Sequence, residues 1–320
     1  MFFSRKFTTL ILSEHNNIKL NPLVYNAVNA AEYFNDDIAI LVAGDACMSV
    51  ATEASLINGV NKVHHINHQN LKHQFPDSMA KVIKQLHQVH NFKRIIAASS
   101  NFSKDIIPRL GGVFEVQPVT EITKIMNEDC YKRSGYSGNA INTIVFHQND
   151  IRLITIRATS FDRNPIKNTS SPIEDFYVKD IKSVMTLLKE DIEKPIRPDL
   201  NNAEIIVAVG KGLKNKKGFK IAEELADCFR GIIGDTKVVI NRNVCNNELQ
   251  IGQSWKNVAP KLYVALGISG DIQHLAEMKD SKVIVAINND PGAPIFSVAD
   301  YGMAADVFEV VPEMIFKIKK

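Results

Sequence analysis

The sequence has few cysteines, no excess of charge of one sign and no long apolar run. Its cysteines are scattered and lack the spacing of metal ligands: Cys47, Cys130, Cys228 and Cys245. We therefore expect reduced, buried thiols in a reducing compartment rather than a disulfide framework. Because no apolar stretch is long enough to cross a bilayer, a membrane-spanning helix is not expected.

Charge balance and length are those of an ordinary globular chain. The 38 basic and 35 acidic residues leave a net charge of +3, which is too balanced to indicate nucleic acid or an anionic membrane as a partner. With 320 residues, of which 45% are hydrophobic, the chain is long enough for two domains that each bury a core.

Several motifs of hydrolytic enzymes are also missing. The sequence contains no Gly-x-x-x-x-Gly-Lys-Ser/Thr phosphate loop, no Gly-x-Ser-x-Gly nucleophile turn and no metal-ligand cluster. Its nine histidines form no ligand pair around a glutamate. An enzyme such as a nucleotide hydrolase is therefore the least favoured class of function.

The first part of the chain alternates between strand patterns and helix patterns. Apolar runs predict strands at 8–12, 38–43, 63–66 and 94–98, and helical spacing predicts helices at 21–33, 49–57, 76–89 and 103–111. This alternation predicts a mostly parallel sheet with helices on both faces.

Two further strands are predicted after these elements, at 143–146 and 151–156. We expect them to form an antiparallel hairpin, joined by a polar turn at 147–150, that closes the first domain.

A domain boundary is predicted where two prolines, Pro195 and Pro198, make a semi-stiff linker. It divides the chain into an N-terminal α/β domain at 1–194 and a second domain at 195–320. The second domain has a predicted helix at 219–230 and five predicted strands, at 204–209, 237–240, 262–266, 283–287 and 307–310. Short parallel strands with helices between them predict a flavodoxin-like, doubly wound sheet.

A glycine-rich stretch at 267–274 separates one of these strands from a predicted helix. A strand that ends at glycines and opens a helix presents backbone N–H groups and a positive dipole end, which suit a phosphate. Ser269 adds a hydroxyl, and Gln273 and His274 add side chains one turn later. Gly210 and Lys211 follow another strand in the same way. Each loop alone is also explained as an ordinary turn, which is the default interpretation of the Gly210 loop.

The wider sequence around these loops resembles one family. Residues 262–274 and 285–302, together with 250–254 and 258–260, closely resemble the signature of the electron-transfer flavoprotein alpha subunit. Residues 136–140 and 157–161 resemble further landmarks of that family, although Ala158 stands where it has glycine. The resemblance extends over nearly the whole chain.

The resemblance implies an electron carrier rather than a substrate-converting enzyme. It implies a heterodimer with a beta subunit that contacts the N-terminal domain, while the C-terminal domain holds FAD. Flavin dehydrogenases, such as the acyl-CoA dehydrogenases of fatty acid beta-oxidation, would supply electrons, and a membrane quinone oxidoreductase would take them. The basic, acid-free residues 1–7 favour the mitochondrial matrix, with the bacterial cytoplasm as the alternative.

The resemblance also implies a set of cofactor-binding positions. These positions are Lys211, Thr236, Lys237, Ile251, Gly252, Gln253, Ser254, Ser269, Gly270, Asp271, Ile272, Gln273, His274, Asn288, Asp306 and Val307. Ser269 and Gly270 suit the pyrophosphate, whereas Asn288 and Asp306 suit the adenosine. The flavin ring would meet Ser254 at N5, His274 at the O2 edge and Lys237 beside it, and these contacts tune its potential.

Departures from the family pattern leave two interpretations open. Lys211 and Lys237 occupy positions where the family has arginine, so this chain lacks the planar guanidinium that binds in a bidentate way. Asp271 replaces an alanine beside the pyrophosphate, and Trp255 and Glu277 replace glycines. The site is then either a working but retuned FAD site, or a weakened one in a non-redox binding or scaffold subunit.

Overall fold

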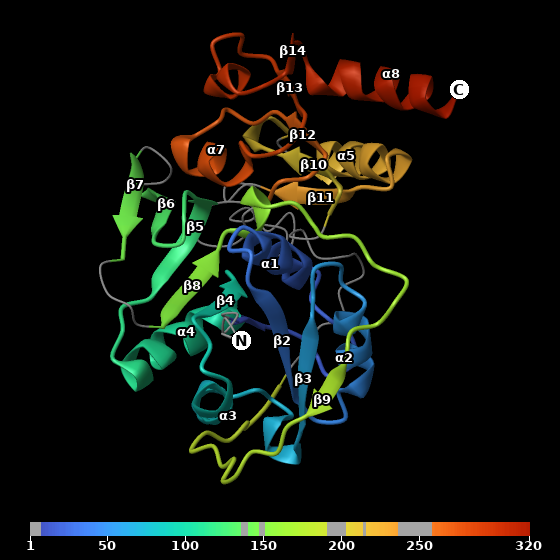
Figure 1. The fold of residues 1–320 in the computed structure, drawn as a ribbon. Helices are drawn as coiled ribbons and strands as arrows, with labels where there is room; N and C mark the ends of the chain where they lie inside the picture. The colour runs from blue at the N-terminus through green and yellow to red at the C-terminus, as the bar shows by residue number, and fades with distance from the viewer. Residues whose placement is uncertain (1–7, 136–139, 147–150, 191–202, 214–215, 236–257) are drawn as a thin grey trace. The chain divides into compact units, whose positions relative to one another are not determined.

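The computed structural model describes residues 8–135, 140–146, 151–190, 203–213, 216–235 and 258–320. The chain divides into two compact units, Met1–Asp191 and Ile192–Lys320 (Figure 1). The boundary predicted between residues 194 and 195 lies outside the described residues.

The N-terminal unit contains a mostly parallel sheet, whose order among the described residues is β7-β6-β5-β8-β4-β1-β2-β3-β9. Its strands are β1 (Thr8–Leu12), β2 (Asp37–Gly44), β3 (Lys62–Asn67), β4 (Arg94–Ala98), β5 (Val119–Ile125), β6 (Cys130–Gly135), β7 (Ala140–Val145), β8 (Arg152–Ile156) and β9 (Ile173–Asp175). Only the β5–β6 and β6–β7 pairs are antiparallel within this part of the chain. The predicted parallel sheet is confirmed.

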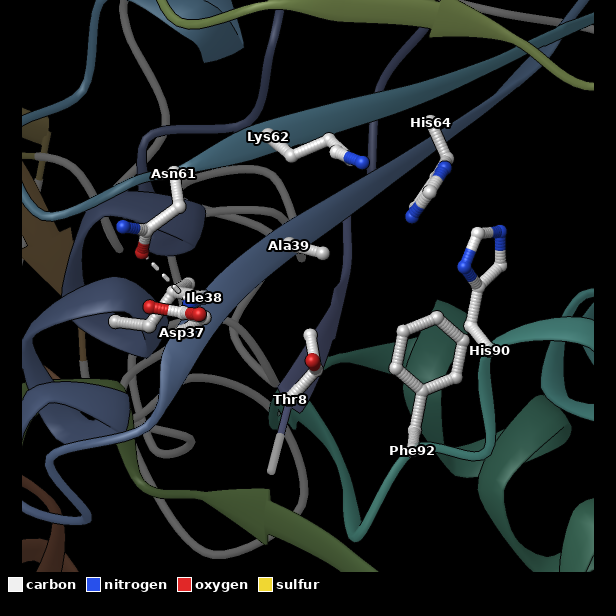
Figure 2. A pocket seen from close by; sticks show the side chains of 9 residues that line it. All are labelled: Thr8, Asp37, Ile38, Ala39, Asn61, Lys62, His64, His90 and Phe92. Atoms are coloured by element: carbon white, nitrogen blue, oxygen red, sulfur yellow. Dashed lines mark hydrogen bonds between the residues drawn. The ribbon is translucent and has the colours of Figure 1, made fainter. Parts of the chain in front are cut away.

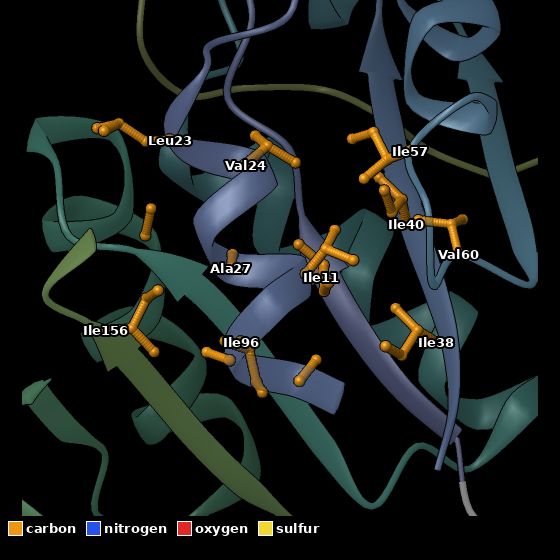
Figure 3. Packing of buried hydrophobic residues seen from close by; sticks show 14 of the residues in the cluster. Ile11, Leu23, Val24, Ala27, Ile38, Ile40, Ile57, Val60, Ile96 and Ile156 are labelled. Carbon is orange, nitrogen blue, oxygen red and sulfur yellow. The ribbon is translucent and has the colours of Figure 1, made fainter. Parts of the chain in front are cut away.

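Helices cover both faces of this sheet. They are α1 (Leu23–Glu32), α2 (Met48–Ser55), α3 (Pro76–His90) and α4 (Asn101–Phe114). Successive strand residues point to opposite faces, so Ile11 packs with α1 and α2, and Leu10 packs with α3 and α4. Figure 3 shows the first of these clusters, where Ile11 and Ile96 lie beside α1, the helix that carries Ala27.

The predicted hairpin of strands 143–146 and 151–156 is wrong. The second strand is β8, which pairs in parallel with β4 and β5, while β7 lies at the sheet edge and pairs with β6. All five residues of β8 are buried, as is typical of a parallel strand inside a sheet. The intervening β5 is only partly buried, and for this reason it left no clear apolar pattern in the sequence.

The C-terminal unit is a parallel sheet of the order β11-β10-β12-β13-β14 in the part that the structure describes. The strands are β10 (Ile205–Val209), β11 (Ile232–Asp235), β12 (Leu262–Leu266), β13 (Ile284–Asn288) and β14 (Tyr301–Ala304). In chain order this is 2-1-3-4-5, the order of flavodoxin-like folds. The predicted doubly wound sheet is therefore confirmed.

Helices again lie on both faces of this sheet. On one face, α5 (Lys216–Cys228) packs with α8 (Val307–Lys319) over Val207 and Val264. On the other face, the short helix α7 (Ile272–Met278) contributes Met278 to a cluster with Tyr263 and Ala265. No helix among the described residues has the length and apolarity needed to cross a membrane.

The strand predicted at 307–310 is also wrong, because these residues begin α8. Asp306 caps this helix by accepting a hydrogen bond from the backbone N–H of Phe308. Val307, Val311 and Ile315 are buried and recur every four residues, which is helical spacing. The strand predicted at 237–240 lies outside the described residues, and the short β11 precedes it.

Candidate cofactor site

Two loops of the predicted site, those after β10 and β12, flank the point where the strand order of the C-terminal sheet reverses. The chain passes from β10 to β11 on one side, and later adds β12 on the other side of β10. In open α/β sheets, ligands bind outside the carboxyl ends of the strands at this switch point. Lys211 directly follows Gly210 after β10, and residues 267–271 follow β12 (Figure 1).

The two loops touch through their backbones. The N–H of Gly210 donates to the carbonyl of Leu266 at 2.9 Å. A Cβ on Gly210 would lie 2.4 Å from the carbonyl oxygen of Gly267, so only glycine permits this approach. The backbone at Gly210, next to Lys211, therefore lies directly against the loop that carries Ser269.

Gly270 fixes the second half of this loop. Its φ is +90°, and a Cβ there would lie 2.4 Å from the backbone nitrogen of Ile295. The N–H of Ile295 donates to the carbonyl of Ser269 at 3.0 Å. The loop after β12 is therefore packed against residue 295 and cannot accept a larger residue at 270.

The side chains at this edge fit a phosphorylated cofactor, with one exception. Lys211, Ser269 and Gln273 are exposed and offer an ammonium, a hydroxyl and an amide to an anion. Asp271 is exposed as well, and its carboxylate makes no capping hydrogen bond to α7. The structure thus gives no capping role for Asp271, and its negative charge opposes a phosphate in this loop. Ile272 is 60% exposed and supplies an apolar surface beside these groups.

Asn288 is the last residue of β13 and Asp306 follows β14, so both lie at the carboxyl edge of the sheet. Asn288 is buried, and its side-chain nitrogen donates to the carbonyl of Ile268 at 2.7 Å while its oxygen accepts from the N–H of Asp290. Asn288 therefore ties the β12 loop to the end of β13. Asp306 is exposed beside its capping bond, whereas Val307 is buried in the core. Their contacts with adenosine remain predictions.

His274 lies inside the unit rather than on its surface. The side chain is 7% exposed, and its Nε2 is 2.9 Å from the hydroxyl oxygen of Tyr263, which is fully buried. Tyr263 is not among the residues that the sequence predicts for the site. The available signal was a hydroxyl within an otherwise aliphatic strand, since a buried tyrosine hydroxyl needs a hydrogen-bond partner.

Six predicted positions cannot be placed. Thr236, Lys237, Ile251, Gly252, Gln253 and Ser254 lie outside the described residues, as does Trp255. In the sequence, Thr236 directly follows Asp235, the last residue of β11. Among the residues that are described, no group of three or more acidic, histidine or cysteine side chains could hold a metal ion.

A separate pocket lies in the N-terminal unit and contains none of the predicted residues. Its volume is about 220 Å³, and it is lined by Thr8, Asp37, Ile38, Ala39, Asn61, Lys62, His64, His90 and Phe92 (Figure 2). The rings of His64 and His90 are 4.4 Å apart between centroids. Burial lowers the pKa of His64 to about 4. The pocket is at the amino ends of β1 and β2, opposite the edge where such sheets bind ligands.

Comparison with known sequences defines the class of protein. Residues 9–181 match the family profile of the electron transfer flavoprotein domain, and residues 199–279 match that of the electron transfer flavoprotein FAD-binding domain. The fold and these matches define a flavoprotein of the electron transfer class, with FAD as the cofactor of its C-terminal domain.

Similar proteins then define the subunit. The chain is 40% identical to the probable electron transfer flavoprotein subunit alpha, mitochondrial, of Caenorhabditis elegans, over 97% of this chain and 93% of that protein. It is 39% identical to the electron transfer flavoprotein subunit alpha of Pseudomonas aeruginosa, over 95% and 98%. The Dictyostelium discoideum mitochondrial alpha subunit is 38% identical, over 98% and 92%. The chain belongs to the electron transfer flavoprotein alpha subunit family, as its sequence signature predicts.

Comparison with solved structures adds nothing to this assignment. A putative thiamin diphosphate-dependent enzyme from Mycobacterium smegmatis is 8% identical, with a TM-score of 0.24 over 98% of this chain and 60% of that one. Such a score is too low to support an argument from fold.

Proposed function

We propose that this chain is the FAD-bearing alpha subunit of a heterodimeric electron carrier. It takes electrons from flavin dehydrogenases, such as acyl-CoA dehydrogenases, and passes them to a membrane quinone oxidoreductase. The observation that carries the proposal is the meeting of the Lys211 loop and the 267–271 loop at the switch point of the C-terminal sheet. FAD supplies the chemistry, because its flavin ring accepts and releases electrons.

The chain's own residues bind and orient the cofactor in this proposal. Lys211 and Ser269, exposed on adjacent loops, hold the pyrophosphate by charge and hydrogen bonding. Asn288 keeps the β12 loop in place through Ile268. His274 donates a hydrogen bond to the flavin ring, which favours the negative charge that a reduced ring carries.

The carrier acts without a small-molecule substrate of its own, so we do not propose it as an enzyme. The names of the similar proteins describe a subunit, and we propose a beta subunit as its stable partner, bound to the N-terminal unit. The dehydrogenases and the quinone oxidoreductase bind only transiently. Mitochondrial and bacterial proteins both occur among the relatives; we propose the mitochondrial matrix, or the cytoplasm in a bacterium.

The proposal is tested by the absorption spectrum of the chain co-expressed with its beta subunit. We expect a yellow heterodimer with close to one FAD per alpha chain, bleached by a reduced acyl-CoA dehydrogenase. A folded heterodimer that stays colourless after soaking with FAD would reject the carrier function and favour a scaffold subunit.

A further inference from the structure

The side chain of Tyr263 reaches from the sheet to a helix of the cofactor-binding unit. Tyr263 is the second residue of β12, and His274 is the third residue of α7. Both are buried, and the hydroxyl oxygen of Tyr263 lies 2.9 Å from Nε2 of His274. The backbone N–H of His274 donates to the carbonyl of Asp271 at 2.8 Å. His274 is therefore held from two sides, by the loop at its backbone and by the strand at its ring.

We propose that Tyr263 is a positioning residue for the flavin: its hydroxyl donates to Nε2 of His274 and keeps the imidazole proton on Nδ1. Nδ1–H is then the donor that His274 offers to the flavin ring. The inference rests on the proposed function, because it concerns how His274 meets FAD. It assigns a role to a residue outside the predicted set of cofactor-binding positions.

The direction of the hydrogen bond follows from the chemistry of the two groups. A neutral imidazole carries a proton on one nitrogen and accepts on the other. The phenol O–H is a much stronger acid than an imidazole N–H, and a bare imidazole nitrogen is a stronger base than a phenol oxygen. The favoured arrangement is therefore O–H donating to Nε2. A ring fixed by such a bond has a defined tautomer, as in metal and catalytic sites where the second nitrogen is held by a partner.

A purely structural role is the competing explanation. In that case the Tyr263 hydroxyl only anchors α7 on the sheet beside Met278, and its removal lowers stability without affecting the flavin. Stability measurements cannot separate these roles, since both lose a buried hydrogen bond. The experiment must therefore measure which ring nitrogen of His274 carries the proton, and the midpoint potential of the flavin.

The tautomer is measured first, in the ¹⁵N-labelled heterodimer stripped of FAD, so that this result does not depend on cofactor binding. Long-range proton–nitrogen spectra report which ring nitrogen is protonated, and His274→Asn identifies the signals of His274. We expect the Nδ1–H tautomer, and signals shifted toward a mixture of tautomers in Tyr263→Phe. An Nε2–H tautomer in the unmodified protein overturns the proposal. So do His274 ring signals that are the same in Tyr263→Phe as in the unmodified protein.

The midpoint potential of the FAD-loaded heterodimer is measured next. The amide of His274→Asn reaches the place of Nδ1, and that of His274→Gln reaches the place of Nε2. We expect Asn to retain more of the original potential than Gln, and Tyr263→Phe to shift it in the same direction as His274→Ala by a smaller amount. The double variant should match His274→Ala. If Tyr263→Phe does not fold, the Asn and Gln pair decides.

Tyr131→Phe is the matched control, because Tyr131 is also fully buried and donates its hydroxyl to a backbone carbonyl, that of Glu128, in the other unit. It should lower stability and leave the potential unchanged. A yellow heterodimer whose potential is the same in Tyr263→Phe as in the unmodified protein rejects only the role of Tyr263. A colourless heterodimer rejects the proposed function instead.

Discussion

The two units of this chain have similar sheets but use their carboxyl edges differently. In the N-terminal unit, polar side chains after β1 bond within the chain: His15 contacts the amide of Gln74 at 2.9 Å, and Asn17 donates to the carbonyl of Lys72 at 2.8 Å. In the C-terminal unit, Lys211 and Ser269, which lie at the carboxyl edge of its own sheet, are exposed. A parallel sheet provides the edge, and the side chains decide whether it can bind a ligand.

The two units also differ in where they bury charge. Arg94 and Arg152 are buried in neighbouring strands of the N-terminal sheet, and they pair with Asp36 and Asp129. Among the described residues of the C-terminal unit, no arginine or lysine is buried. Substitutions of the buried charges in the N-terminal unit should therefore lower the free energy of unfolding. Substitutions at the carboxyl edge of the C-terminal sheet should instead change the affinity for FAD.

The largest effect is expected from Arg94→Met. The guanidinium is fully buried, lies 4.1 Å from the ring centroid of Phe34 and pairs with Asp36 and Glu128. Removing it leaves a carboxylate without its buried partner, at a cost of about 3–5 kcal/mol in the free energy of unfolding. Urea unfolding measures this loss, and FAD affinity should not change. Lys93→Met, which removes the neighbouring cation with its bond to Glu128, should cost less than about 1 kcal/mol.

Acid should weaken the N-terminal unit next most strongly. Burial lowers the pKa of His15 and of His64 to about 4. The unfolded chain therefore binds more protons than the folded one as pH falls from about 6.5 to about 4, and each histidine removes up to about 3 kcal/mol of stability over that window. Hydrogen exchange of β3 and α3 at a series of pH values measures the loss.

The variant His64→Phe tests how much of this acid-induced loss of stability comes from His64. The Nδ1 of His64 has no hydrogen-bond partner within the described residues, so phenylalanine keeps the ring volume and loses no such bond there. The pH dependence should become shallower between pH 6.5 and 4. His73→Gln, at an exposed histidine, is the control and should leave the slope unchanged. Equal slopes in His64→Phe and the unmodified chain would contradict the assignment to His64.

The third effect concerns the loop of the C-terminal edge, in the variant Gly270→Ala. The φ of +90° and the approach of Ile295 to 2.4 Å predict strain of about 1–3 kcal/mol and at least a roughly tenfold loss of FAD affinity as the loop moves. Titration of FAD into stripped heterodimer measures it. Gly292→Ala is the control, because its Cβ would meet only Asp290, at 3.4 Å. Similar losses in both variants would mean that the loop geometry is not what binds FAD.

Much of the fold is predictable from sequence, for a physical reason. The predictions for β4 and β12 match to the residue, because strands buried on both faces leave continuous apolar runs. Strand β5 leaves no such run. The valines at 307–310 resemble a strand because β-branched residues favour strands, and the cap at Asp306 was the signal for a helix.

The site is less predictable than the fold. The sequence predicts that the Gly210 loop and the 267–274 loop follow strands of one doubly wound sheet, whose carboxyl edge is where ligands bind. It does not predict the bond between Tyr263 and His274, since this depends on how α7 is seated over β12. It also leaves open whether the Asp271 carboxylate points at the phosphates or turns outward to cap its helix. This depends on one side-chain rotamer, and the structure shows an exposed carboxylate without a capping hydrogen bond.

The smallest effect, and the sharpest test of the exposed edge, is Asp271→Ala. An exposed carboxylate about 4–5 Å from a phosphate in high dielectric repels it by roughly 1 kcal/mol, so removing it should tighten FAD binding about fivefold. The gain should shrink in 0.5 M salt, because screening removes most of such an interaction. Asp280→Ala makes the same charge change beyond the other end of α7 and should have no comparable effect. If the two variants gain equally, only net charge matters; if Asp271→Ala gains nothing at low salt, the carboxylate does not face the pyrophosphate.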